Sequence, residues 1–172
     1  MSSDTIRVAS LGLGWWSDVL AEGITNAKGI EVVSCFTRSE DKRKAFAEKF
    51  NCAYAGSYEE LLEDDTIDAI INTTPNNIHL ETTKQAADAG KHVFLDKPIA
   101  NSVGEGMEIA KICHAANVRL SIGFQRRRES QFRWVQEEIQ AGRFGQIVQA
   151  EANISRDRLG AFEPGHWRYT AE

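Results

Sequence analysis

Two glycines separated by one residue follow the first apolar run of the sequence, Ile6–Leu11, and precede a helical pattern. The motif reads Gly12-Leu13-Gly14-Trp15-Trp16-Ser17. The first glycine permits a tight turn, and the second lets the backbone approach a diphosphate held by free amides at a helix N-terminus. This spacing predicts a dinucleotide-binding turn made of Gly12, Leu13, Gly14, Trp15 and Trp16, with Ser17 in place of the usual third glycine. The alternative is a tight glycine turn that binds no ligand.

The second apolar run, Ile30–Phe36, is followed by Thr37-Arg38-Ser39. An acidic residue at this point would accept hydrogen bonds from the ribose hydroxyls of NAD. An arginine with hydroxyl neighbours can instead hold a 2′-phosphate through charge-assisted hydrogen bonds worth about 1.5–3 kcal/mol each. The segment therefore favours NADP. In the alternative, Arg38 is a solvated loop residue lying over the adenine, and NAD remains acceptable.

Two further polar segments follow apolar runs. Thr74-Pro75-Asn76, with His79 at the start of a helical pattern, comes after the third run, and Asp96-Lys97-Pro98 comes after the fourth. The carboxyl ends of parallel strands are where open α/β sheets bind ligands, and a lysine there can hydrogen-bond a substrate hydroxyl. The alternatives are a surface lysine paired with Asp96 and a histidine satisfied by the backbone.

These segments need strands and helices in alternation, and the sequence supplies both. Apolar runs rich in β-branched residues predict strands at Ile6–Leu11, Ile30–Phe36, Ile67–Asn72, His92–Leu95 and Val118–Ile122. Between them, helical patterns cover Trp15–Lys28, Asp41–Phe50, a short segment after Ser57, Ile78–Ala89 and Ser102–Ala116. The fold class predicted is therefore α/β, with a doubly wound parallel Rossmann-type sheet covered on both faces.

The pattern changes after the fifth run. A polar stretch from Gly123 carries Arg126-Arg127-Arg128, a helix is predicted at Phe132–Ala141, and alternation at Ile147–Ile154 predicts a strand with one buried face. We therefore place a dinucleotide-binding domain at residues 1–123. Residues 124–172 are expected to begin a second, incomplete α/β domain.

Composition excludes several classes of function. The 172 residues carry 20 basic and 25 acidic side chains, and a net charge of −5 disfavours nucleic acid and anionic membrane surfaces. No apolar run approaches the roughly 18 residues of a membrane span, and the N-terminus lacks a signal-peptide layout, so a cytoplasmic protein is expected. The three cysteines show no metal-ligand spacing, which predicts reduced thiols and no metal site.

Taken together, five segments resemble the Gfo/Idh/MocA oxidoreductase family. They are Gly12-Leu13-Gly14, Thr74-Pro75-Asn76 with His79, Ala89-Gly90-Lys91-His92-Val93, Asp96-Lys97-Pro98 and Gly123-Phe124-Gln125-Arg126-Arg127. The resemblance implies a Rossmann domain followed by a C-terminal α/β domain whose large open sheet makes homo-oligomers. It also implies hydride transfer between NAD(P) and a hydroxyl carbon of a small-molecule substrate, usually a sugar, polyol or related ring.

The resemblance also implies roles for single residues. Asp96-Lys97-Pro98 matches the family's Glu-Lys-Pro, whose lysine contacts substrate, so the resemblance makes Lys97 the candidate catalytic residue. It also implies that Lys97 and Asp96, a shorter carboxylate than the family's glutamate, contact the cofactor. The segment that matches Thr-Pro-x-x-x-His would place Thr74, Pro75, Asn76 and His79 beside the nicotinamide. Arg126 would contact the cofactor or the substrate.

Family members continue, beyond a segment resembling Trp167-Arg168, to a helix bearing an aspartate and a histidine that complete the catalytic set. His166 does not match that histidine, so we expect the 172-residue chain to hold nucleotide without full activity. A non-catalytic nucleotide-binding or redox-sensing module is the alternative function, which Lys97 disfavours. A methyltransferase is a weaker choice because it has no use for Asp96-Lys97-Pro98.

Overall fold

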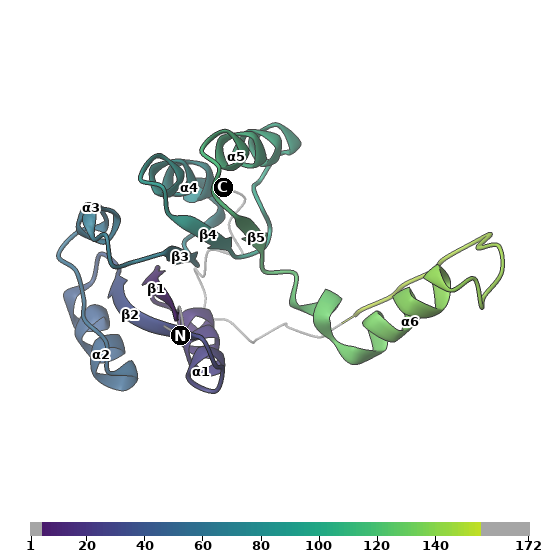
Figure 1. Ribbon diagram of the computed structural model, residues 1–172, viewed down its shortest axis with the longest axis horizontal. Coiled ribbons are helices and arrows are strands. Elements are labelled where there is room, and N and C mark those ends of the chain that lie inside the picture. The colour runs from purple at the N-terminus through teal and green to yellow at the C-terminus, as the bar shows by residue number, and fades with distance from the viewer. Residues whose placement is uncertain (1–4, 156–172) are drawn as a thin grey trace. The chain divides into compact units, whose positions relative to one another are not determined.

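Five parallel strands hydrogen-bond side by side in the order β2-β1-β3-β4-β5 (Figure 1). The computed structural model describes residues 5–155. The strands are β1 (Ile6–Leu11), β2 (Ile30–Phe36), β3 (Ala69–Asn72), β4 (His92–Leu95) and β5 (Leu120–Ile122). The chain moves outward from β1 to β2 and then crosses back to β3 on the other side of β1. This reversal places a topological switch point between β1 and β3, and it confirms the predicted doubly wound Rossmann-type α/β sheet.

The helices connect these strands in the predicted order, with ends shifted by a few residues. They are α1 (Trp15–Thr25), α2 (Glu40–Phe50), α3 (Tyr58–Glu63), α4 (His79–Asp88) and α5 (Val103–Ala115), with 3₁₀ turns η1 (Asn76–Ile78) and η2 (Gln125–Arg128). The side chains of Ser39, Ser57 and Ser102 accept amide hydrogen bonds that start α2, α3 and α5. Among the described helices, none has the length and apolar character that crossing a membrane requires.

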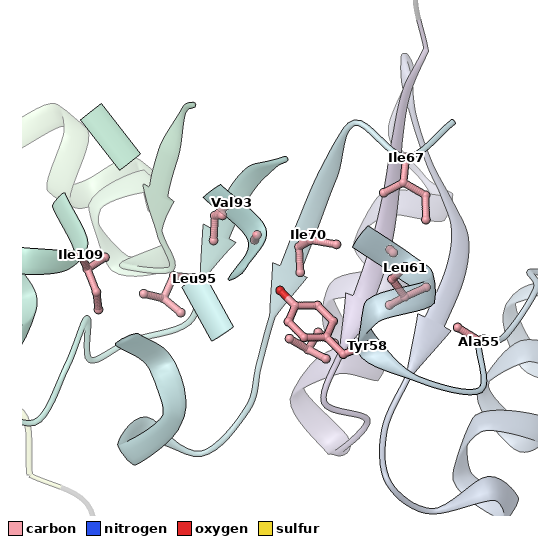
Figure 2. Packing of buried hydrophobic residues seen from close by; sticks show 11 residues of the cluster. Ala55, Tyr58, Leu61, Ile67, Ile70, Val93, Leu95 and Ile109 are labelled. Carbon is pink, nitrogen blue, oxygen red and sulfur yellow. The ribbon is translucent and has the colours of Figure 1, made fainter. Parts of the chain in front are cut away.

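One face of the sheet packs against α3, α4 and α5, and this interface is the main core (Figure 2). Ile70, Leu95 and Ile109 are fully buried there. Tyr58 lies in the same core, and its hydroxyl donates to the Thr82 carbonyl at 2.9 Å. Burial raises the pKa of the Tyr58 phenol, so this hydroxyl stays a neutral donor at physiological pH.

The opposite face is covered less completely. Leu20 and Ile24 of α1 pack over its β1 side, and an apolar groove of about 440 Å³ runs beside them over β1, β3, β4 and β5. Ile71, Phe94 and Ser121 contribute to its floor. Helices thus lie on both faces of the sheet as predicted, and α1 covers only part of this face.

The chain divides into two compact units, Met1–Arg127 and Arg128–Glu172, where the sequence suggested a boundary near Gly123. The second unit contains α6 (Ser130–Gln140), which buries none of its residues. The predicted strand at Ile147–Ile154 is wrong: those residues are exposed and form no strand, because no other described segment pairs with them. His166 and Trp167-Arg168 lie outside the described residues.

The buried position of Leu95 generates a stability prediction. Leu95→Ala should lower the free energy of unfolding by about 2–5 kcal/mol, since it removes a fully buried side chain from the centre of the main core. Urea denaturation followed by circular dichroism measures this change. Val103→Ala, at a side chain that is 82% exposed, is the matched control and should stay within about 0.5 kcal/mol of the parent. A loss below about 1 kcal/mol for Leu95→Ala would contradict the packing described here.

Candidate dinucleotide site

The register of the parallel sheet brings the predicted site segments to one edge. Leu11 is paired with both Phe36 and Asn72, Asn72 with Leu95, and Leu95 with Ile122. The segments that begin at Gly12, Thr37, Thr74, Asp96 and Gly123 each start within two residues of one of these strand ends, whereas Ala89–Val93 leads into the start of β4. Backbone hydrogen bonds join consecutive segments: Gly12 N donates to Phe36 O, Thr73 N to Leu11 O, and Asp96 N to Asn72 O, each at 2.9 Å.

The two glycines of the first turn have different reasons to be glycine. Gly12 has a φ of +83°, and a Cβ there would lie 2.9 Å from the Thr74 amide nitrogen, so the fold itself excludes a side chain. Gly14 has a φ of −126°, and a Cβ there would meet no protein atom within 4 Å. A side chain at Gly14 would therefore not collide with the chain, and the open space beside the turn leaves room for a group such as a diphosphate to approach.

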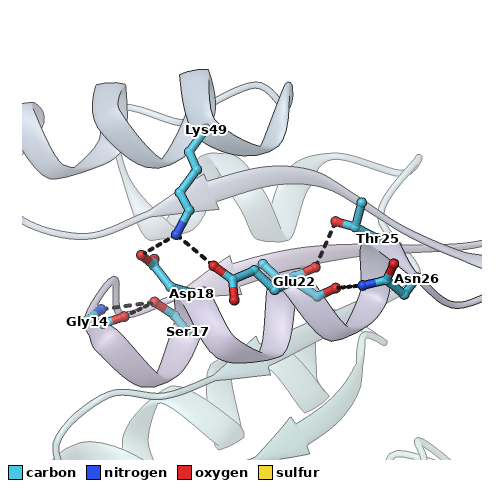
Figure 3. Close-up of polar contacts among 8 residues, drawn as sticks. Gly14, Ser17, Asp18, Glu22, Thr25, Asn26 and Lys49 are labelled. Carbon is cyan, nitrogen blue, oxygen red and sulfur yellow. Dashed lines mark hydrogen bonds and ion pairs between the residues drawn. The ribbon is translucent and has the colours of Figure 1, made fainter.

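Ser17, which replaces the third glycine, closes the turn from inside (Figure 3). Its hydroxyl is buried, accepts a hydrogen bond from Gly14 N at 2.9 Å and donates one to Gly14 O at 2.6 Å. The Gly14 amide is thereby used within the turn. A diphosphate here would meet the first-turn amides of Trp15 and Trp16, which have no acceptor inside an α-helix.

A cavity of about 310 Å³ opens beside the turn, between α1 and α2. Its lining combines apolar, acidic and basic side chains: Leu13, Gly14, Trp15, Asp18, Lys42, Ala45, Phe46 and Lys49. Trp15 is 78% exposed, whereas the Leu13 side chain is part of the core. Sequence reasoning missed Lys42, which enters this lining because two helices pack together.

Lys49 holds these two helices together at the cavity. Its ammonium lies 3.0 Å from Asp18 and 2.9 Å from Glu22, so α2 is bridged to α1 (Figure 3). The hydrogen bond to Glu22, and to a smaller extent the one to Asp18, raises the pKa of Lys49. Because all three groups are exposed, the bridge adds little stability, and its main effect is to position the helices.

The segment after β2 is shaped by a residue that sequence reasoning missed. Arg43 of α2 donates from Nη1 to the Thr37 carbonyl at 2.7 Å and the Arg38 carbonyl at 3.4 Å. Its guanidinium also lies 5.4 Å from the centre of the Phe36 ring. Arg43 therefore turns Thr37-Arg38-Ser39 back toward α2, and the Arg38 and Ser39 side chains are exposed. Its position one turn into a helix that follows the loop was a signal available in the sequence.

Thr74 and His79 are held by buried hydrogen bonds after β3. The Asn72 side chain accepts from the Thr74 amide at 3.1 Å and from the Thr74 hydroxyl at 2.7 Å. His79 is fully buried, and its two ring nitrogens lie next to the carbonyl oxygens of Thr74 and Pro98. This burial favours the alternative of a histidine satisfied by the backbone over a side chain that contacts the cofactor. Pro75 and Asn76 lie between Thr74 and His79, where η1 begins.

Lys97 is exposed after β4, and no ion pair with Asp96 occurs within residues 5–155. Asp96 packs against Gly123, where a Cβ would lie 3.1 Å from Asp96 Oδ1. That oxygen is buried and has no hydrogen-bond partner among the described residues. The lysine of this segment is therefore presented to solvent, and its carboxylate neighbour faces inward.

Arg126 and Lys91, the other basic residues considered in the sequence motifs, differ in their surroundings. Arg126 lies in η2, directly beyond the carboxyl end of β5, and is half-buried. Lys91 is buried and donates to the carbonyls of Asp64 at 2.7 Å and Ile67 at 2.9 Å, so its role is structural. Over the described part of the chain, no group of three or more His, Cys, Asp or Glu side chains is arranged to hold a metal ion.

A match to a known family agrees with this geometry. Residues 6–124, which include all five strands, match the profile described as an oxidoreductase family with an NAD-binding Rossmann fold. The chain belongs to the Gfo/Idh/MocA family of oxidoreductases. The match confirms the resemblance inferred from the motifs and assigns the N-terminal unit to a class of NAD-binding domains.

Individual relatives extend the similarity through most of the chain. An uncharacterized oxidoreductase of Schizosaccharomyces pombe is 32% identical over 167 residues, which are 95% of this chain and 45% of the relative. A crystal structure from Desulfitobacterium hafniense, assigned as an NADPH-dependent oxidoreductase, is 33% identical with a TM-score of 0.79, covering 82% of this chain and 41% of its own. Myo-inositol 2-dehydrogenase from Lactobacillus plantarum is 26% identical with a TM-score of 0.75, covering 83% and 43%. The chain thus spans less than half the length of these relatives.

The contrast between the two glycines is testable. Gly12→Ala should lower the thermal unfolding midpoint strongly, since it combines a left-handed backbone with a backbone clash and costs at least about 1–3 kcal/mol. Gly14→Ala should leave the midpoint within a few degrees of the parent but weaken binding of NADPH and NADH, because its methyl group would occupy the approach to the turn. Differential scanning fluorimetry and a fluorescence titration measure the two effects. Equal losses of stability in the two variants would contradict the distinction.

Proposed function

We propose that this chain is the cofactor-binding part of an NADP(H)-dependent dehydrogenase that oxidises a hydroxyl carbon of a sugar, polyol or related ring. The observation that supports this proposal most is that the Gly12–Gly14 turn, the basic segment Thr37-Arg38-Ser39 and the exposed Lys97 lie at one edge of a parallel sheet. Relatives of this chain include proteins whose names specify NADPH or an inositol substrate. Complete family members are proposed to form homo-oligomers through their C-terminal domain.

The preference for NADP rests on the end of β2. Thr37-Arg38-Ser39 occupies the place where an acidic residue would select the free ribose hydroxyls of NAD. The exposed Arg38 guanidinium, with Ser39 beside it, can bond a 2′-phosphate. Lys42 follows one turn later and lines the neighbouring cavity, where it adds a second positive charge. Glu40, the nearest acidic side chain of α2, is paired with Lys44 at 2.8 Å.

The nicotinamide end of the bound cofactor is proposed to lie on the opposite side of the switch point from Thr37-Arg38-Ser39. The bound cofactor supplies the hydride acceptor or donor, while the chain supplies position and a proton-bearing group. Pro75 and Asn76 would border the nicotinamide, and the exposed ammonium of Lys97 can hydrogen-bond a substrate hydroxyl and take part in its proton transfer. Arg126 would contact cofactor or substrate from the end of β5.

Calorimetric titration of the purified chain with NADPH, NADH and S-adenosylmethionine tests the proposal. We expect binding of both nicotinamide cofactors, with NADPH tighter, and no binding of the methyl donor. Absence of binding by both nicotinamide cofactors would overturn it, as would a preference for S-adenosylmethionine. An assay of NAD(P)-dependent turnover against a panel of polyols measures whether the 172 residues alone are catalytically active. We expect no turnover above background.

The proposed 2′-phosphate contact can be tested by charge removal. Arg38→Ala should weaken NADPH binding about 10- to 150-fold, which corresponds to the loss of about 1.5–3 kcal/mol, and should change NADH binding little. Arg119→Ala removes an equally exposed arginine from the start of β5, at the other end of the strand, and should change neither affinity. Equal losses for NADPH and NADH in Arg38→Ala would contradict the contact.

A further inference from the structure

His79 joins two loops that carry different parts of the candidate site. Its Nε2 lies 3.0 Å from the carbonyl oxygen of Thr74, which precedes Pro75-Asn76. Its Nδ1 lies 3.1 Å from the carbonyl oxygen of Pro98, which directly follows Lys97. The imidazole thus stands between two backbone segments that are more than 20 residues apart in sequence.

We propose that His79 is a positioning residue, which sets the relative placement of the Thr74-Pro75-Asn76 loop and the Lys97 loop without touching cofactor or substrate. This inference rests on the proposed function above. His79 is fully buried on the first turn of α4, so its side chain acts through the two carbonyls. A neutral imidazole donates to only one of these carbonyls, whereas the doubly protonated ring donates to both.

The first loop is restrained on both sides by this arrangement. The Asn72 side chain holds the amide and the hydroxyl of Thr74, and His79 holds its carbonyl. Asn72 is itself held by the Thr82 hydroxyl at 2.8 Å, and that hydroxyl donates to the Ile78 carbonyl at 2.7 Å. The restraints on Thr74 therefore trace back to buried groups of β3 and α4, which do not depend on a ligand.

In the Lys97 loop, the backbone is restrained on both sides of Lys97. The Asp96 amide donates to the Asn72 carbonyl at 2.9 Å, and beyond Pro98 the Ile99 side chain packs into the main core. The contact of the Pro98 carbonyl with His79 lies between these two points. The Lys97 side chain is exposed, while the backbone on either side of it is restrained. His79 is the residue that connects this backbone to the Thr74 loop.

This role predicts a loss confined to the nicotinamide half of the cofactor. His79→Phe keeps an aromatic ring of similar size and removes both polar contacts, so the adenosine-binding segments after β1 and β2 should be unaffected. We expect NADPH binding by the 172-residue chain to weaken at least fivefold. Binding of adenosine 2′,5′-bisphosphate, which lacks the nicotinamide half, should stay within twofold of the parent. His79→Gln keeps one amide donor and should lose less NADPH affinity than His79→Phe.

Thr83→Val is the matched control, because Thr83 is fully buried on the same helix and its hydroxyl has no partner among the described residues. It should leave both affinities unchanged, and all titrations are run at a temperature where circular dichroism shows each variant folded. Should His79→Phe fail to fold, His79→Gln alone carries the comparison of the two ligands. Equal losses for NADPH and adenosine 2′,5′-bisphosphate, or no loss for either, would overturn the positioning role. Failure of the parent to bind NADPH would instead overturn the proposed function; if the parent prefers NADH, the pair NADH and ADP replaces the two ligands.

Discussion

Hydrogen-bonded alignment of five parallel strand ends is the constraint on which the site depends. Parallel pairing places the carboxyl ends of all strands at one edge, and the register puts Leu11, Asn72 and Leu95 level with one another. Each loop that follows then begins at the same height. Because β1 lies between β2 and β3, the glycine turn stands at the point where the chain reverses direction across the sheet, which is the position where open α/β sheets bind ligands.

Buried polar groups convert this alignment into a defined geometry. A polar group left unpaired in the interior costs about 1–3 kcal/mol. Asn72, Thr82 and His79 avoid that cost because Asn72 pairs with Thr82 and the His79 ring lies against two loop carbonyls. The same hydrogen bonds that satisfy the interior thus determine where Thr74 and Pro98 lie. Arg43 does the equivalent for the segment after β2 by binding its carbonyls. In both places, side chains that bind loop carbonyls restrain the backbone of the candidate site.

The two glycines of the first turn differ in what surrounds them. The backbone of Thr74 lies too close to Gly12 to admit a side chain there, whereas a side chain at Gly14 would meet open space. Ser17 departs from the family pattern, yet its buried hydroxyl closes the turn through two hydrogen bonds with Gly14. With serine at this position the Gly14 amide is bonded inside the turn, and α1 still begins at Trp15.

Much of this architecture was predictable because its signals are local. Strand and helix positions follow from hydrophobic periodicity, and the order of motifs after each strand identified the sheet edge, the cofactor class and the family. Ile147–Ile154 shows the limit: its alternation satisfies the local pattern, but a strand exists only when another segment supplies hydrogen-bond partners. His79 shows the same limit at the site, because a motif places it near the nicotinamide while packing buries it against Thr74 and Pro98. Burial, cavity lining and the exposed state of Lys97 depend on contacts between segments tens of residues apart, and such contacts form only when the chain is folded.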